Sequence, residues 1–582
     1  MLTLYHEWRD LLRQEFHHYN RAAFQKDLLA GLTVAAVALP LALAFGVASG
    51  ATAAAGLVTA IIAGILIGLL SGAPYQISGP TGAMSAVLIV LAARYGLEGI
   101  WIAGVLAGVM ILILGIFRLG RVVSLIPAPV IAGFTSGIAV IIAIGQIDNF
   151  LGITTPPAEN VIEKLSYYIV NGVDPNLQAV SLALLVMAVM VFWPRLHFVR
   201  QIPGSLVGII LATIIAAIAN WDVPVIGSIP RTILLEDRLN LNAVPWDQIS
   251  NLIVPAMSIA ALGAIESLLC GAVGGNMTGF RMRNSVELIG QGIGNIVIPF
   301  FGGVPATAAI ARTSVGIKSG GVTRLTSVIH GLAMLAAALL LGSVIGRIPL
   351  SALAGVLMVT AWRMNEWHAI QFFFSKRLRH AIIAFLTTLA ATVLLDLTQA
   401  ILIGFGVSTL IFMAQMSDLH VNRQPVDAKR LTAAGHQFVH PGHNIAVYYV
   451  SGPLFFAAAR KLVEEVERLD SAEDTVILSM RGVPLVDATG VEVLRELYHR
   501  QQKGGGDLLF ASVQPRVEGL LERVGFLQEI GSDRHFWSAD RAILSLGAEL
   551  SPVVPEPPES PEVGLDGTLE IAIHEERTEI SL

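Results

Sequence analysis

The sequence predicts an α-helical membrane protein with fourteen transmembrane segments, followed by a small α/β domain. Of the 582 residues, 54% are hydrophobic and only 14% are charged, against about 25% charged in an average soluble chain. Residues 1–419 hold 22 Lys/Arg and 18 Asp/Glu, about 10% of that stretch, whereas residues 420–582 hold 15 and 25, about 25%. The first part therefore has the composition of a membrane domain and the second that of a globular protein.

The apolar runs follow one another closely along the first part. They cover residues 29–48, 53–71, 80–93, 98–117, 126–145, 177–194, 204–220, 251–273, 285–301, 306–317, 325–346, 350–362, 380–395 and 398–415. A helix needs about 20 residues to cross a bilayer, and the runs that follow Pro80 and Pro305 are shorter than that. We interpret these two runs as half-helices that begin inside the membrane.

Basic residues gather in alternate loops of this pattern. The long loop 146–176 holds Lys164 as its one basic residue, while the opposite side carries Arg118, Arg121, Arg195, Arg200, Arg281, Arg283, Lys318, Arg324, Lys376, Arg377 and Arg379. By the positive-inside rule, this asymmetry predicts a multi-pass protein of the cell membrane with both termini in the cytoplasm.

The pattern also predicts the domain boundaries. We expect a cytoplasmic N-terminal segment at 1–28, a transporter domain at 29–418 and a linker at 419–437. Strand-like and helix-like stretches then alternate over 438–550, which predicts the α/β domain. The tail 551–582 carries five prolines and eight acidic residues against one arginine, so we expect it to be disordered.

The two half-helices hold matching places, third among the first seven spans and third among the second seven. Each follows a glycine- and proline-containing stretch, at 76–84 and at 302–310. Interrupted segments at corresponding places indicate a transporter binding site, because irregular backbone at membrane depth survives only where it is buried or lines a cavity. The alternative is that both breaks serve packing alone.

The helix starts at these two places suit an anion. Pro80-Thr81 and Pro305-Ala306-Thr307 open the half-helices, and small residues such as Gly82 and Ala83 leave the backbone N–H groups accessible. Two helix N-termini that face each other direct free N–H groups and positive dipole ends at one point. We therefore expect a small anionic substrate there.

Two charged residues lie inside apolar runs. Glu266 lies about midway along the span 251–273, where a charge is costly and usually functional. It would carry a coupling proton or cation, or alternatively serve as a structural carboxylate bonded to a neighbouring helix. Arg312 would add positive potential behind the anion site, pair with Glu266, or anchor the helix at the cytoplasmic side.

No pattern of an enzyme or a metal centre occurs in the sequence. There is no GxSxG, HExxH or Walker A motif, and His330 has no Cys or His partner at metal-ligand spacing. We expect no enzymatic activity, no cofactor, no bound metal other than a possible sodium ion at Glu266, and no nucleic-acid partner.

The chain resembles the SulP family of sulfate-permease-like anion transporters over about residues 25–545. The blocks that carry the resemblance are DLLAGLTVAAVALPLALAFGVASG at 27–50, AIESLL at 264–269, NMTG at 276–279, ELIGQGIGN at 287–295 and GGVPATAAIART at 302–313. The resemblance implies a fold of seven plus seven spans related as inverted repeats. It also implies a core domain that moves against a gate domain in a homodimer.

The resemblance also implies the site residues. The anion would lie between the starts of the third and tenth spans, with Glu266 tied to proton or cation coupling. The substrate-binding positions would be Thr81, Gly82, Ala83, Thr307, Ala308, Ala42, Phe45 and Arg312.

Departures from the family pattern leave the substrate and the coupling ion open. Leu41 stands where many sulfate-type members carry Gln, which resembles the bicarbonate-transporting branch. That branch often has Asp at the position of Glu266 and uses sodium, so Glu266 favours proton-coupled or uncoupled members. The run Gly274-Gly275-Asn276 replaces a more usual Ala-Asp-Gly and removes one possible polar contact.

The α/β domain resembles a STAS domain through the stretch VPLVDATG at 483–490. In anti-sigma-factor antagonists that share this module, the residue at Thr489 is phosphorylated, and a phosphate there would meet a helix dipole. The same Asp-x-Thr-Gly pattern is also a good N-cap, and we favour the cap alone. A cytoplasmic protein partner of this domain is a further hypothesis.

Together these features predict a secondary active transporter for sulfate or bicarbonate, with elevator-like alternating access and symport of a cation or proton. The alternatives are a proton-coupled dicarboxylate transporter, an anion channel, and a signalling protein that senses an anion and reports it through the STAS domain.

Overall fold

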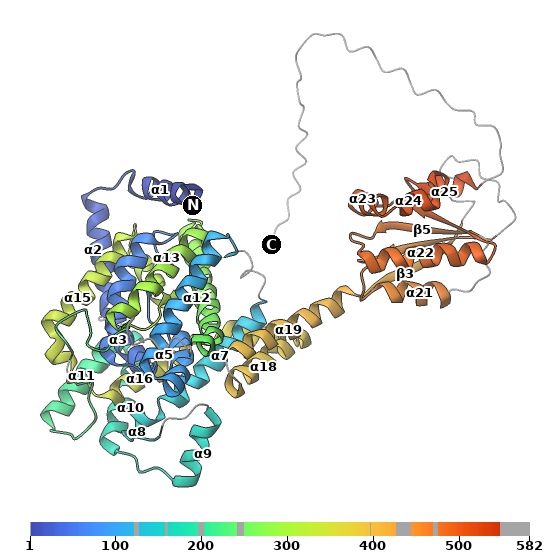
Figure 1. Cartoon of the computed structure of the whole chain (residues 1–582). Coiled ribbons are helices and arrows are strands. Elements are labelled where there is room, and N and C mark those ends of the chain that lie inside the picture. The colour runs from blue at the N-terminus through green and yellow to red at the C-terminus, as the bar shows by residue number, and fades with distance from the viewer. Residues whose placement is uncertain are drawn as a thin grey trace, which may run out of the picture. The chain divides into compact units, whose positions relative to one another are not determined.

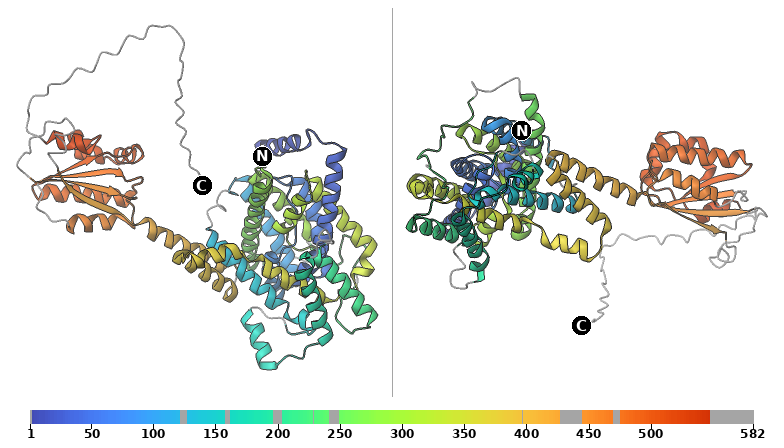
Figure 2. Two further views of the ribbon diagram at one scale, coloured as in Figure 1. Left: turned by 180° about the vertical axis from the view of Figure 1, so that it is seen from behind. Right: turned by 90° about the horizontal axis from the view of Figure 1, so that it is seen from below.

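The computed structural model describes residues 2–120, 127–156, 161–195, 203–227, 229–240, 249–395, 397–426, 444–468 and 475–546. The chain forms two compact units, Met1–Phe412 and Met413–Leu582, which Figure 1 and Figure 2 draw from three sides. The expected tail 551–582 and residues 427–437 of the expected linker lie outside the described residues.

The first unit is a bundle of helices. Its first half consists of α1 (Leu2–Phe16), α2 (Arg21–Ala48), α3 (Ala53–Ile62), the π-helix η1 (Ala63–Ile67), α4 (Gly68–Leu70), β1 (Ser78–Gly79), α5 (Gly82–Ile116), α7 (Ala128–Gly145), α8 (Ile147–Leu151), α9 (Val161–Asn171), α10 (Leu177–Phe192), the 3₁₀ turn η2 (Trp193–Arg195) and α11 (Gly204–Ile218). Side-chain caps begin several of these helices: Asn20 accepts from the Ala23 N–H, Thr52 from Ala55 and Asn176 from Gln178.

The second half of the bundle also contains a short strand between helices. It consists of α12 (Ile249–Thr278), α13 (Asn284–Val297), the 3₁₀ turn η6 (Ile298–Phe301), β2 (Thr307–Ala308), α14 (Ile310–Lys318), α15 (Leu325–Ile345), α16 (Leu350–Met364), α17 (Trp367–Ser375), α18 (Arg379–Leu394) and α19 (Leu397–Met416). Its α14 has nine residues, too few to cross a membrane alone.

Each of the fourteen expected spans coincides with a helix. The third and fourth spans are joined in α5, where Gly96 adopts a left-handed φ of 66° and separates a first helical stretch from a second. By length and composition, seven helices of the described residues are able to cross a membrane, and four shorter apolar helices accompany them. The second part of α5 packs closely on α13, because Gly108 and Gly292 carry no side chain between the two backbones.

The second unit contains a five-stranded sheet in the order β3-β4-β5-β6-β7. The strands are β3 (His420–Pro425), β4 (Ile445–Ser451), β5 (Thr475–Gly482), β6 (Asp507–Ala511) and β7 (His535–Phe536), and the helices are α21 (Ala459–Arg468), α22 (Ala488–Lys503), α23 (Pro515–Arg523), α24 (Phe526–Ile530) and α25 (Ala539–Ser545). Strands β4 to β7 are parallel, and β3 pairs with β4 in the antiparallel sense.

Side chains alternate between the two faces of this sheet, as the period of a strand requires. On β4, Ala446 and Tyr448 pack with Leu494 of α22, whereas Ile445 and Val447 pack with Ala542 of α25. Strand β3 lies within the range expected to be a linker. Residues 420–425 are therefore an edge strand of the α/β domain, which begins earlier than position 438.

Candidate functional site

The loops that precede the two half-helices pair with each other. Strands β1 and β2 are antiparallel, with Ser78 opposite Ala308 and Gly79 opposite Thr307. Helix α5 begins at Gly82 and α14 at Ile310, each within three residues of its strand. The pairing therefore brings together two helix N-termini that are more than 200 residues apart in the sequence, and their first N–H groups have no partner within the helix.

Thr81 links the start of α5 to the carboxylate of Glu266. Its hydroxyl accepts a hydrogen bond from the Met84 N–H (3.4 Å) and donates one to Oε2 of Glu266 (2.9 Å). Glu266 is partly exposed, and it lies in the middle of α12. The carboxylate thus stands at the positive end of α5, in hydrogen-bond contact with the residue that caps this helix.

Thr307 and Ala308 are fixed against the same stretch of α12. The Thr307 hydroxyl lies 2.9 Å from Oγ of Ser267 and donates to the Gly263 carbonyl, and the Ala308 N–H donates to Ser267 Oγ. Ser267 in turn accepts from Gln76 through its carbonyl (2.7 Å). Thr307 and Ala308 are both buried. The Thr307 hydroxyl is already engaged in these hydrogen bonds within the protein.

Arg312 lies behind the crossing of the two strands. Its side chain is 2% exposed, and its Nη2 donates to the carbonyl of Pro80 (2.8 Å). The guanidinium rests against Gly79, where a Cβ atom would come within 2.5 Å of Nη1. This burial contradicts a role as a cytoplasmic anchor, and the described residues contain no ion pair between Arg312 and Glu266.

The structure also places Gly82, Ala83, Phe45 and Ala42. Gly82 lies at a crowded point, because a Cβ on it would meet Ile142 of α7, Met364 of α16 and the ring of Phe45. Ala83 is buried in the first turn of α5. Ala42 is buried as well, and its carbonyl packs against Gly56 of α3.

A polar stripe on α13 was missed by the sequence analysis. Glu287, Gln291 and Asn295 are all 0% exposed. Asn295 exchanges two hydrogen bonds with the backbone of Ala306 (2.9 and 2.7 Å), and Gln291 donates to Ser78 (2.7 Å). Their spacing of four residues, which places them on one face of a helix, was the available signal, but the stretch was used only as a block of resemblance.

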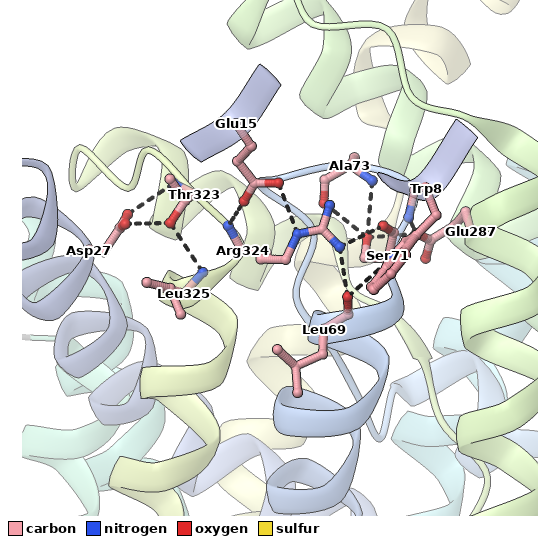
Figure 3. A network of polar contacts seen from close by, with 11 residues as sticks. Trp8, Glu15, Asp27, Leu69, Ser71, Ala73, Glu287, Thr323, Arg324 and Leu325 are labelled. Carbon is pink, nitrogen blue, oxygen red and sulfur yellow. Dashed lines mark hydrogen bonds and ion pairs between the residues drawn. The ribbon is translucent and has the colours of Figure 1, made fainter. Parts of the chain in front are cut away.

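A second buried network lies where the chain enters the bundle (Figure 3). Asp27, 0% exposed, accepts from the N–H groups of Val322 and Thr323 and from the hydroxyls of Thr323, Thr326 and Tyr19. Burial and the neighbouring Asp27 raise the pKa of Tyr19 to about 12, so the phenol remains a donor at neutral pH.

Arg324 joins α1 to the core of this network. It pairs with Glu15 (2.8 Å) and donates to the carbonyls of Leu69 and Ser71, as Figure 3 shows. The charged residues Asp27, Glu287 and Arg324 are thus at least as buried as the two that the sequence analysis singled out.

In the second unit, the start of α22 is capped by Asp487. Its carboxylate accepts from the Gly490 N–H (2.8 Å) and from the Phe456 N–H (3.1 Å). Thr489 is exposed in the first turn of the helix. The capping function of this stretch is therefore present, and it belongs to Asp487.

Comparisons with known proteins cover nearly the whole chain. The profile of the sulfate permease family matches residues 24–387, and that of the STAS domain matches residues 439–540. The putative sulfate transporter YvdB of Bacillus subtilis is 35% identical over 533 residues, which are 90% of this chain and 97% of the relative. The bicarbonate transporter BicA of Picosynechococcus is 30% identical over 538 residues, 89% and 94% of the two chains.

Solved structures show the same fold. Murine Slc26a9 in the inward-facing state matches with a TM-score of 0.80 at 18% identity and covers 91% of this chain and 92% of its own. The transmembrane domain of a cyanobacterial BicA matches with a TM-score of 0.58 at 31% identity and covers 67% and 98%. The expected fold class, a helical transporter domain followed by a STAS domain, is confirmed.

Proposed function

The chain belongs to the sulfate permease family, and on this premise we propose that it is a secondary active transporter of sulfate or bicarbonate in the cell membrane. Family membership makes it a transporter and not an enzyme. Both anions stay in the proposal because one relative is named for sulfate and the other for bicarbonate.

The observation that carries the proposal is the antiparallel pairing of β1 with β2. It holds the N-termini of α5 and α14 at one place, and each helix end contributes about half a positive charge together with free N–H donors. Arg312, buried behind the strands, adds a full positive charge. Such a site recognises charge and size, which suits small inorganic anions.

Glu266 supports coupling to a proton or to sodium. An ionised carboxylate next to the anion opposes binding: two unit charges about 5 Å apart repel by about 3 kcal/mol at an effective dielectric constant near 20. That is on the order of a hundredfold in affinity. A proton on Glu266, or a sodium ion bound by Glu266 and neighbouring oxygens such as the Thr81 hydroxyl, removes the repulsion, so anion and cation favour each other's binding.

The remaining parts of the proposal concern the whole assembly. In an elevator-like cycle, the helices that carry β1 and β2 would move as a body against the helices that include α7 and α16. We further propose a homodimer, with both termini in the cytoplasm and the STAS domain as the part that meets a cytoplasmic partner. Thr489, exposed at a helix start, would be the phosphorylation site if such signalling occurs, and phosphopeptide mass spectrometry of the native protein tests this.

The proposal is tested by uptake of labelled sulfate and of labelled bicarbonate into proteoliposomes that contain the full chain. We expect saturable uptake of at least one anion, driven by an inward proton or sodium gradient. Protein-free liposomes control for leakage and for diffusion of carbon dioxide. Absence of saturable flux for both anions refutes the proposal, uptake of succinate alone favours the dicarboxylate alternative, and conductance that does not saturate favours a channel.

A further inference from the structure

The two strands that define the anion site are too short to hold their own register. Strands β1 and β2 share two residue pairs, and even a full two-stranded hairpin is marginally stable in isolation. The alignment of the two half-helices must therefore be set by side chains outside the strands.

The polar stripe of α13 contacts both strands. Gln291 Nε2 donates to Ser78 Oγ at 2.7 Å, and Ser78 is the residue of β1 opposite Ala308. One turn further along α13, Asn295 bonds the N–H and carbonyl of Ala306, which directly precedes β2. The polar face of α13 thus fixes where the start of each half-helix lies along this helix.

Glu287 fixes the orientation of Gln291. Its Oε1 accepts from Gln291 Nε2 (2.9 Å), while Oε2 accepts from the Ser71 hydroxyl (2.7 Å) and the Gly72 N–H (2.8 Å). Each of these partners donates to Glu287, so the carboxylate requires the amide nitrogen of Gln291, and not its oxygen, on this side. The second hydrogen of the same nitrogen then points at Ser78.

Resting on the proposed function, we propose that Glu287 and Gln291 are positioning residues that set the affinity for the transported anion. They do so by holding β1 in register with β2, and with it the N-terminus of α5 opposite that of α14. Neither residue needs to touch the anion.

The directions of the hydrogen bonds allow a test by exchange of the two side chains. In Gln291→Glu, two carboxylates meet where the present atoms are 2.9 Å apart, so the bond between residues 287 and 291 fails or requires an extra proton. In the double variant E287Q/Q291E, the amide oxygen of residue 287 accepts from Ser71 and Gly72, and its nitrogen donates to residue 291. The Ser78 hydroxyl then donates to the new carboxylate, so every bond is restored, and only the two bonds of residue 291 have reversed direction.

The first readout is saturable uptake of labelled sulfate by the full chain in proteoliposomes, or of labelled bicarbonate if that is the anion carried. We expect Gln291→Glu to raise the half-saturation concentration about tenfold with the maximum rate changed less than threefold, and the double variant to return within threefold of the wild type. Ser136→Ala is the control, because Ser136 is a buried hydroxyl of α7 without a partner among the described residues, and it should change neither value.

The second readout is amide hydrogen exchange of the full chain in detergent, which needs no transport. Peptides covering 74–84 and 302–311 should exchange faster in Gln291→Glu and return to the wild-type rate in the double variant. If Gln291→Glu does not fold, Gln291→Met takes its place, because Met keeps the volume and removes both bonds.

The two readouts separate the failure of this inference from the failure of the proposed function. A wild type without saturable uptake of either anion, but with the expected exchange pattern, refutes the transport assignment and leaves the register role standing. Unchanged half-saturation and exchange in Gln291→Glu, or a double variant that restores neither, overturns the inference while transport by the wild type stands.

Discussion

Glu266 and Thr81 form a unit whose two members serve different purposes. The Thr81 hydroxyl caps α5 and at the same time donates to the carboxylate. A change at either residue therefore alters both the charge at the helix start and the shape of the first turn. Conservative substitutions separate the two effects.

Glu266→Gln is expected to abolish coupling while the fold is kept. The amide is neutral and still accepts from Thr81 through its oxygen. The variant therefore mimics a wild-type site in which Glu266 stays protonated. Sulfate or bicarbonate uptake should lose its dependence on proton and sodium gradients, which is measured in proteoliposomes with imposed gradients. Thermal unfolding in detergent should change little, and a variant that keeps the wild-type pH and sodium dependence would show that Glu266 does not couple.

Thr81→Val is expected to weaken anion binding, because it removes the cap and frees the Glu266 carboxylate to approach the anion. Loss of an N-cap hydroxyl costs about 1 kcal/mol, which corresponds to roughly fivefold in half-saturation. Thr81→Ser keeps the hydroxyl and is the matched control. Equal half-saturation concentrations for the Val and Ser variants would contradict a role of this hydroxyl at the site.

The sequence pattern predicted a role for Glu266 but gave no sign that Asp27 and Arg324 are buried, and this difference has a physical reason. Glu266 lies mid-span, where no solvent can reach an isolated helix, so its position alone marks it. Asp27 and Arg324 lie near the ends of expected spans, where a charge ordinarily meets water or headgroups. Their burial results from long-range packing of α1, α2 and α15, which no local pattern reveals.

At the end of the bundle near α1, side chains on one helix bond to backbone groups near the end of another helix, and these bonds hold the helices together. The N–H groups of Val322 and Thr323, which directly precede α15, donate to Asp27 of α2, and this carboxylate takes five hydrogen bonds in all. Arg324 donates to the carbonyl of Leu69 in α4 and to that of Ser71, which follows the end of this helix. Helix ends that are buried require such partners.

Asp27→Ala is expected to destabilise the first unit by about 3 kcal/mol or more, since it leaves buried backbone donors without acceptors at about 1–3 kcal/mol each. Asp27→Asn should cost less, because one amide oxygen remains and the hydroxyls of Thr323 and Tyr19 are able to accept. Glu7→Gln is the control: it removes a solvent-exposed ion pair with Arg118 that is worth at most about 1 kcal/mol. Thermal unfolding in detergent measures all three, and an Asp27→Ala midpoint no lower than that of Glu7→Gln would refute the capping role.

Helices were easier to predict than the first strand of the C-terminal domain. The fourteen spans follow from hydropathy because every backbone group inside a helix is satisfied locally, and the half-helices follow from their shortness. Strand β3, HVNRQP, has no apolar alternation, and its residues other than Val421 are exposed. It pairs through backbone bonds at the sheet edge, and such pairing has no signature in side-chain pattern.

The transport proposal for the whole molecule depends on motion between groups of helices in the first unit. Gly82, at the start of α5, is the point where the candidate site meets α7 and α16: a Cβ there would lie 2.8 Å from Ile142 Cδ1 and 3.0 Å from Met364 Sδ. If these helices move apart during transport, the contact exists in only part of the cycle. A bulkier residue then penalises one state and shifts the population towards the others.

Gly82→Ala is therefore expected to lower the maximum rate of uptake about tenfold. A tenfold change corresponds to a destabilisation of one state of the cycle by about 1.4 kcal/mol. Ile142→Val removes the Cδ1 atom that the new methyl group would meet, so the double variant Gly82→Ala with Ile142→Val should regain most of the rate. Gly406→Ala on α19 is the matched control, because a Cβ there has no neighbour within 4 Å. Initial rates at saturating anion, in proteoliposomes with equal amounts of folded protein, provide the measurement. A double variant as slow as Gly82→Ala would contradict the proposal that the contact of Gly82 with Ile142 of α7 governs the transport cycle.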